Sequence, residues 1–131
     1  MFQRFLILLA IGFFGFIGWV IYLANTGQKS VFFDLVAAIP YGDKLGHFLL
    51  FGLLTLFINL AFKFKASVIG GFKIYWAALI VFTFVVLEEF SQYFIATRTF
   101  DLVDLLADLS GIVFFCIVST FLSKKLYPIT T

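Results

Sequence analysis

Charged residues are scarce in this chain, where Asp, Glu, Lys and Arg make up 12% of the 131 residues. A soluble domain is about a quarter charged and about half apolar. Here the apolar share is 63%, the mean hydropathy is +1.15, and 21 residues are phenylalanine. This composition excludes an ordinary soluble domain. It predicts an integral membrane protein with a single transmembrane domain over residues 1–131.

Cysteine and histidine each occur once, as Cys116 and His47. A lone cysteine excludes a disulfide within the chain and a CxxC redox motif. A lone histidine disfavours a zinc site, because zinc usually binds several His or Cys side chains. The chain also lacks an internal repeat, a low-complexity segment and a Lys/Arg-rich stretch. We therefore expect no nucleic-acid partner, and the sequence indicates no particular cofactor.

Long apolar runs account for most of the sequence. A membrane-spanning helix needs about 20 mostly apolar residues to cross a hydrocarbon core of about 30 Å. The first run could instead be a signal peptide, but it is long for that role and lacks a clear small-residue cleavage site. We therefore predict an all-α protein, a four-transmembrane-helix bundle, with spans at Phe5–Ala24, Leu45–Phe62, Ile74–Ile95 and Leu102–Leu122.

A shorter apolar segment, Val31–Ile39, lies between the first and second predicted spans. Ser30 is a suitable N-cap for it, and Pro40 and Gly42 end it. The segment is too short to cross a membrane. We predict that it forms a short interfacial helix on the outer surface.

Lysine and arginine are more frequent in cytoplasmic loops than in outer ones. If the N-terminus is cytoplasmic, the inner side carries six such residues and the outer side three. The inner six are Arg4, Lys63, Lys65, Lys73, Lys124 and Lys125, and the outer three are Lys29, Lys44 and Arg98. This difference predicts that both the N- and C-termini are cytoplasmic.

Ionisable residues interrupt three of the four spans. At about 1.5 Å per helical residue, Glu88 and Glu89 lie about 21 Å from the inner end of the third span, and Asp108 lies about 9 Å below the outer end of the fourth. The spacings within each span place its polar residues on one helix face. We expect ten residues to meet at one outer level and call them the polar cluster: Asp43, Lys44, His47, Glu88, Glu89, Gln92, Arg98, Asp101, Asp104 and Asp108.

Membrane depth decides which of these residues need a partner. Charges at helix ends, such as Asp43 and Asp101, can be solvated caps. Glu88, Glu89 and Asp108 lie too deep for short side chains to reach water, so a buried network is the physical expectation.

Two arrangements follow from this expectation. We expect Arg98 to pair with a carboxylate, and we expect one cavity open to the outer side. The candidate partners of Arg98 are Glu88, Glu89, Asp101 and Asp104. The expected lining of the cavity is Asp43, His47, Glu89, Gln92 and Asp108.

The polar residues form four ordered strings between about residues 40 and 112. In chain order these are Asp43-Lys44-x-x-His47-Phe48, Glu89-x-x-Gln92, Arg98-x-x-Asp101-x-x-Asp104, and Ala107-Asp108-Leu109-Ser110-Gly111. Their order, spacing and membrane context resemble the VanZ-like family of small membrane proteins. That family has an asparagine where this chain has Asp108, which adds a potential negative charge here.

The resemblance implies a protein of the bacterial inner membrane and cell envelope. The founding member of the family accompanies a glycopeptide-resistance gene cluster and is associated with reduced sensitivity to teicoplanin, an antibiotic. A weaker similarity links Glu88, Glu89 and Gln92 to the EExxxR motif of glutamate intramembrane proteases. Tyr93 stands where that motif has arginine, and four helices are too few for that family.

Three classes of function remain open. A non-enzymatic envelope factor would bind membrane lipids, a lipid-linked cell-wall precursor or an envelope protein, with Lys44, Arg98 and His47 facing anionic groups. A membrane-embedded enzyme would use His47 or a glutamate as general acid or base on a lipid phosphate. The third class is a transporter or a proton-coupled protein. We favour the first.

A metal-dependent version of the enzyme is a further alternative. It would use His47, Glu89 and Asp108 with either Glu88 or Asp104 as ligands. With one histidine among mainly carboxylate ligands, an oxygen-liking cation fits such a set better than zinc.

Overall fold

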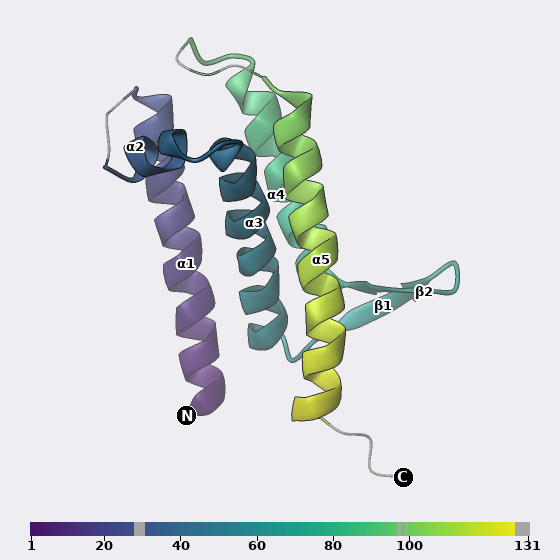
Figure 1. Ribbon diagram of the computed structural model, residues 1–131. Helices are drawn as coiled ribbons and strands as arrows, with labels where there is room; N and C mark the ends of the chain where they lie inside the picture. The colour runs from purple at the N-terminus through teal and green to yellow at the C-terminus, as the bar shows by residue number, and fades with distance from the viewer. Residues whose placement is uncertain (28–30, 97, 99, 128–131) are drawn as a thin grey trace.

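The chain folds into helices that run alternately up and down, followed here in a computed structural model (Figure 1). The structure describes residues 1–27, 31–96, 98 and 100–127. Lys29 and the predicted cap Ser30 lie outside the described residues. In chain order the elements are α1 (Phe2–Asn25), α2 (Val31–Ala38), α3 (Gly42–Ala61), β1 (Ala66–Ile69), β2 (Phe72–Tyr75), α4 (Trp76–Gln92) and α5 (Leu102–Leu126).

Three helices within the described ranges, α1, α3 and α5, are long and apolar enough to cross a membrane. Helix α4 is shorter than the predicted span Ile74–Ile95. It has 17 residues and a length of about 25 Å, whereas the hydrocarbon core is about 30 Å thick. It contacts both α3 and α5. Three of the four predicted spans are therefore matched by helices of spanning length, and α4 is a shorter helix packed against them.

The prediction of an all-α protein was wrong for residues 66–75, which form a small antiparallel hairpin. Gly70 and Gly71 connect β1 to β2 with φ of 60° and 82°, and two successive positive φ angles suit a tight two-residue hairpin turn. Ile74 and Tyr75, assigned from the sequence to the third helix, belong to β2. The β-branched and aromatic side chains around the glycine pair explain the difference, because they favour strands.

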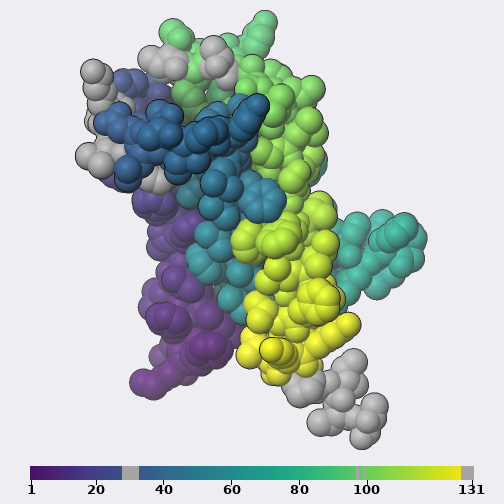
Figure 2. Space-filling view, in the orientation of Figure 1, coloured from purple at the N-terminus to yellow at the C-terminus, as the bar shows by residue number. Residues whose placement is uncertain are grey.

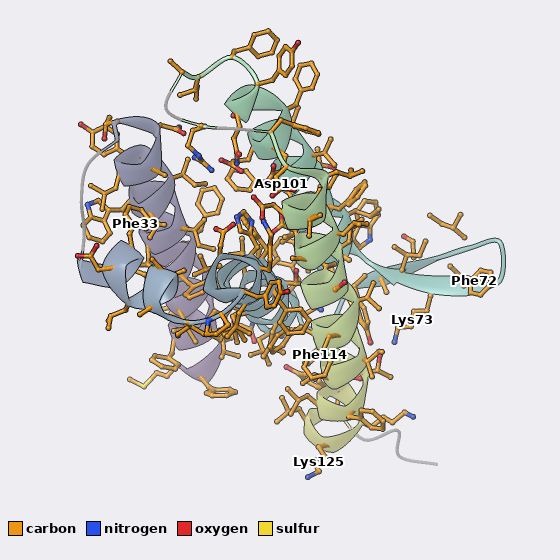
Figure 3. The ribbon with its side chains drawn as sticks, turned by 45° about the horizontal axis from the view of Figure 1, so that its top comes forward. Phe33, Phe72, Lys73, Asp101, Phe114 and Lys125 are labelled. Atoms are coloured by element: carbon orange, nitrogen blue, oxygen red, sulfur yellow. The ribbon has the colours of Figure 1, made fainter. Side chains whose placement is uncertain are left out.

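The hairpin projects away from the helices (Figures 1 and 2). Phe72 lies on its outer part (Figure 3), whereas the Lys73 ammonium group lies over the Tyr75 ring, 5.1 Å from its centroid. Val68 and Phe72 are both 75% exposed, so the hairpin presents apolar side chains to its surroundings. Its base is fixed by the Tyr75 hydroxyl, which lies 2.8 Å from the Thr120 hydroxyl of α5.

The predicted short helix between the first two spans is present as α2, which ends at Ala38, one residue before the predicted end. It lies across the upper ends of α1 and α3 in the space-filling view (Figure 2). Gly42, the first residue of α3, is buried, and a side chain there would overlap the Val36 carbonyl oxygen. The fold therefore requires a glycine where α2 turns into α3.

Helix α3 packs along α5 more extensively than any other pair of elements. Side-chain contacts join Lys44 to Asp104, His47 to Asp108 and Asn59 to Ser119, which are 60 or 61 positions apart. This constant offset means that α3 and α5 run in the same direction, with α4 returning the chain between them.

Two glycines allow this packing to be close. A methyl group on Gly111 of α5 would overlap the Phe48 carbonyl oxygen of α3. One on Gly52 would overlap the Phe115 ring. Small residues that let two backbones approach are common between membrane helices.

A small apolar core forms where the helices meet, made of Ile17, Phe51, Leu54, Val81, Val85 and Ile112. The Phe14 and Phe84 rings, 5.3 Å apart, join α1 to α4. Many other large apolar side chains face outward, including Leu8 and Leu87, which are 67% and 63% exposed. Such an apolar exterior is expected where helices face lipid.

Replacing Gly111 by alanine should lower the free energy of unfolding by about 1–3 kcal/mol, because the added methyl group overpacks a backbone contact. Gly15→Ala in α1 is the matched control, since a methyl group there meets nothing within 4 Å. That change should be neutral or slightly stabilising, because alanine favours helices over glycine. Thermal unfolding of both variants in detergent measures the difference. Equal stability of the two would contradict the close α3–α5 contact.

Candidate functional site

All ten residues of the polar cluster are joined by side-chain contacts at one end of the bundle. They come from α3, α4, α5 and the connection between α4 and α5. Figure 3 shows nitrogen and oxygen atoms gathered near Asp101, at the start of α5. Distant parts of the chain meet there because α3 and α5 begin at the same end and α4 finishes there.

Lys44 is the cation at the start of α3. Its ammonium group donates to Asp101 at 2.7 Å, to Asp43 at 3.2 Å and to Asp104. Its side chain is 27% exposed and that of Asp104 is 10% exposed. These contacts join the first turns of α3 and α5. They pair the Lys44 ammonium group with three carboxylates.

Asp101 also begins α5, because its side chain accepts a hydrogen bond from the Val103 amide at 2.9 Å. This is the arrangement of a helix N-cap. The hydrogen bond from Lys44, and then the one from Val103, hold the pKa of the Asp101 carboxyl below its usual range. Asp101 therefore has the structural role that its position at a helix end predicts.

His47 lies one turn deeper in α3 and contacts carboxylates from both ring nitrogens. Its Nδ1 is 2.9 Å from Asp108 Oδ1 and 3.9 Å from Glu89 Oε1. Its Nε2 is 3.8 Å from Asp43 Oδ1 and 3.7 Å from Asp104 Oδ2. The imidazole thus bridges α3 to α4 and α5.

Arg98 pairs with Glu88, as expected from the sequence, at 3.5 Å between Nη1 and Oε1. The same Nη1 donates to Asn25 Oδ1 at 2.7 Å, which links the arginine to the end of α1. Gln92 Nε2 donates to Glu88 at 2.8 Å and to Glu89 at 3.4 Å. The two adjacent glutamates therefore have different partners. Glu88 contacts both Arg98 and Gln92, whereas Glu89 contacts only Gln92 of these two.

Glu89 and Asp108 are the most deeply buried carboxylates, 1% and 0% exposed. Each uses one oxygen, while Glu89 Oε2 and Asp108 Oδ2 are buried without a hydrogen-bond partner among the described residues. A buried carboxylate oxygen without a partner is energetically unfavourable. Glu88 Oε1 is likewise buried without a hydrogen-bond partner among the described residues, so hydrogen bonds satisfy the three buried carboxylates only in part.

A cavity of about 370 Å³ lies beside this network. Asp43, His47, Glu88 and Arg98 provide its polar lining. Apolar residues of α1, α2 and α3 form the rest of its wall, including Ile17, Val20, Phe33, Val36, Leu50 and Phe51. One side of the cavity is therefore charged and the other suits a hydrocarbon chain.

The expected lining was right for Asp43 and His47 and wrong for Glu89, Gln92 and Asp108. Those three lie behind His47 and Glu88, because α4 and α5 pack against α3 and close the space around them. Glu88 and Arg98 take their place in the lining. Lys44, which we expected from the sequence to face an anionic ligand, has its ammonium group beside three aspartates.

Asn25 was missed from the sequence as a partner of Arg98, since it ends an apolar helix and belongs to no motif. Asn59 and Ser119 form a second buried polar contact, 3.0 Å long, between α3 and α5. The place of Asn59 in an otherwise apolar span is the sequence signal for this contact, because polar side chains in such spans commonly bond across helices.

Replacing Lys44 by methionine should lower the free energy of unfolding by about 2 kcal/mol. The value lies between the cost of breaking an exposed pair and that of leaving a fully buried charge unpaired. Lys44→Met/Asp104→Asn should recover part of the loss, because it removes the charge left behind. Lys124→Met, at an exposed position, is the control. Unfolding in detergent measures all three, and a double variant no more stable than Lys44→Met would contradict the pairing.

Comparison with known proteins supports the resemblance noted from the polar strings. Residues 5–123 match the family described as VanZ/LLP1. No curated protein matches the chain significantly. No solved structure matches it either. Because the match covers nearly the whole sequence, this chain belongs to the VanZ/LLP1 family.

Proposed function

We propose that this chain is a multi-pass protein of the bacterial inner membrane that binds an anionic, lipid-attached group in the cavity beside the polar cluster. The group belongs to a membrane lipid or a lipid-linked cell-wall precursor. The cavity opens toward the outer leaflet, and occupation of the site underlies reduced teicoplanin sensitivity. The observation that carries the proposal is the two-sided lining of the cavity, with Arg98 on one side and an apolar wall on the other.

Arg98 is the group best placed to meet an anion. A guanidinium has five N–H donors. The contacts to Asn25 and Glu88 described above both use Nη1, so the other donors of Arg98 have no partner among the described residues. Arginine binds phosphate and carboxylate groups strongly, because its fork of donors matches their oxygens.

The apolar wall suits the attached chain. Ile17, Val20 and Phe33 come from α1 and α2, so the short helix forms part of the cavity. Binding sites of this volume are usually mainly apolar with a few placed polar groups. A lipid held here would keep its headgroup near Arg98 and His47 while its tail follows α1.

The orientation of the chain is part of the proposal. The excess of lysine and arginine at the end opposite the polar cluster favours a cytoplasmic position for that end. The cluster then faces outward, where a lipid-linked cell-wall precursor is exposed. Both chain ends are cytoplasmic in this arrangement.

Single-cysteine labelling tests the orientation in a Cys116→Ser background. Ala96→Cys, next to the polar cluster, should react with a membrane-impermeant maleimide added to intact cells. Lys124→Cys, near the end of α5, should react only after the membrane is opened. Both positions are exposed in the folded chain, so burial does not limit their reaction. The opposite pattern would reverse the proposed orientation.

Binding of a polyprenyl phosphate to the purified protein tests the ligand class, with native mass spectrometry as the measurement. Arg98→Gln should weaken binding about tenfold or more, because a hydrogen bond to a charged group is lost. Arg4→Gln, an exposed position at the other end of the bundle, is the matched control and should bind normally. Equal affinity of wild type and Arg98→Gln would remove Arg98 from the binding site.

The same variants connect binding to the phenotype. In a susceptible bacterium, expression of the wild type should reduce teicoplanin sensitivity. The effect should be smaller with Arg98→Gln and unchanged with Arg4→Gln. Vancomycin is tested in parallel. It separates an effect on teicoplanin from a general change of the envelope.

A lipid-phosphate hydrolase or transferase is the second candidate. His47 favours it, because the ring lines the cavity while Nδ1 lies 2.9 Å from the Asp108 carboxylate. A carboxylate that orients an imidazole is typical of a general base. Release of inorganic phosphate from a polyprenyl diphosphate by the wild type, but not by His47→Gln, would establish this activity in place of binding alone.

A further inference from the structure

Three potential metal ligands converge from three different helices. One nitrogen of His47 in α3 and one carboxylate oxygen each of Glu89 in α4 and Asp108 in α5 all lie within 4.8 Å of one another. Two of the separations from Nδ1 are 2.9 Å to Asp108 and 3.9 Å to Glu89. Neighbouring ligands of an octahedral ion are about 3.0–3.4 Å apart for bond lengths of about 2.1–2.4 Å. Small side-chain rotations would therefore bring the three atoms to bonding distance around one ion.

The unpartnered oxygens provide an independent indication. Glu89 and Asp108 are almost completely buried, yet Glu89 Oε2 and Asp108 Oδ2 have no hydrogen-bond partner among the described residues. Each oxygen belongs to a carboxylate that already contributes its other oxygen to the group of three ligands. A bound cation would compensate both carboxylates where hydrogen bonds do not.

The second nitrogen of His47, Nε2, lies near two carboxylates but beyond hydrogen-bond distance. Nε2 lies 3.7 Å from Asp104 Oδ2 and 3.8 Å from Asp43 Oδ1. Metal-binding histidines commonly direct their other N–H toward a carboxylate, which fixes the ring and its tautomer. Gln92 likewise contacts Glu89 Oε1 and so orients a second ligand.

A competing group of three ligands, Asp43, His47 and Asp104, is less suitable. Lys44 already neutralises both of its aspartates. Asp43 is also exposed, with a side chain that is 65% accessible. The buried group formed by His47, Glu89 and Asp108 has no lysine or arginine in direct contact among the described residues.

We propose that His47, Glu89 and Asp108 bind a divalent first-row cation, with Mn²⁺ as the representative ion. The His47 ring also lines the cavity, so the proposed ion lies next to that cavity, behind its wall. The proposal goes beyond lipid binding and does not depend on which lipid the cavity accepts.

The ligand types select this class of ion. Imidazole suits transition metals, whereas carboxylates suit Mg²⁺, Ca²⁺ and Mn²⁺. Mn²⁺ fits a set of one nitrogen and two carboxylates, because it is a transition metal and also binds carboxylates. Calcium requires six to eight oxygen ligands, which this buried site with its imidazole does not provide.

The charge of the polar cluster agrees with a bound cation. Its six carboxylates, Asp43, Glu88, Glu89, Asp101, Asp104 and Asp108, face two permanent cations, Lys44 and Arg98. An ion bound between Glu89 and Asp108 would reduce this excess where burial is greatest. It would also reduce the repulsion felt by an anionic group in the neighbouring cavity.

Mn²⁺ binding to the full chain, purified in detergent without added lipid, tests the proposal. Electron paramagnetic resonance follows the loss of the free Mn²⁺ signal during a titration. The wild type should bind one ion per chain, and Glu89→Gln and Asp108→Asn should each weaken binding about tenfold or more. Glu88→Gln is the matched control, because it removes a neighbouring buried carboxylate outside the group of three ligands. It should change the affinity by less than about threefold.

Thermal unfolding provides a second readout that separates lost binding from lost folding. Mn²⁺ should raise the Tm of the wild type and of Glu88→Gln, because the ion binds only the folded chain. It should leave the Tm of Asp108→Asn unchanged, while that variant remains folded without the ion. Zinc should compete with Mn²⁺ for the site, whereas an equal concentration of Ca²⁺ should not.

Three results would overturn the proposal. The first is the absence of saturable Mn²⁺ binding by the folded wild type below about 1 mM, a range that includes weak natural sites. The second is equal weakening by Glu88→Gln and Glu89→Gln, which would indicate general attraction to an acidic surface. The third is displacement by Ca²⁺ as effective as displacement by Zn²⁺, which would exclude the first-row assignment. None of these results would affect the lipid-binding experiment, which uses Arg98→Gln.

Discussion

The close parallel contact between α3 and α5 is the constraint on which the other features depend. Gly111 allows the two backbones to approach, and the contacts that follow recur at nearly the same sequence offset along both helices. Lys44 and His47 can reach the aspartates of α5 only because the helices are held this closely. The polar contacts in turn fix the relative position of the helices, since a one-turn shift would leave buried carboxylates without partners.

Within this arrangement, the cations and the carboxylates are distributed unequally. Lys44 pairs with aspartates where α3 and α5 begin. Arg98 contacts Glu88 and also Asn25, at the end of α1. The most deeply buried carboxylates, Glu89 and Asp108, have only His47 and Gln92 beside them. Such an arrangement is costly for stability alone, because burial opposes charge unless it is fully paired. Ionisable residues at membrane depth are therefore the first candidates for a functional site.

Helices α4 and α2 also shape this end of the molecule, whereas the hairpin lies away from it, at the start of α4 (Figure 1). Helix α4 is shorter than α1, α3 and α5, and its last turn carries Glu88, Glu89 and Gln92 to the level of His47. The chain before it forms β1 and β2, and the Tyr75 hydroxyl fixes the base of the hairpin against α5. Helix α2 contributes Phe33 and Val36 to the cavity wall, so the connection between α1 and α3 is part of the site as well.

The sequence by itself determined the membrane class, the apolar segments, the polar cluster and the pairing of Arg98 with a carboxylate. These follow from composition, helical spacing and the cost of an isolated charge in lipid. Only the tertiary structure decided which residues line the cavity, because packing places Glu89, Gln92 and Asp108 behind its wall and Asn25 beside Arg98. It also decided the hairpin at residues 66–75, which a short apolar run leaves ambiguous between strand and helix. Spacing along one helix fixes the face on which a side chain lies, whereas its partner depends on how closely other helices approach that face.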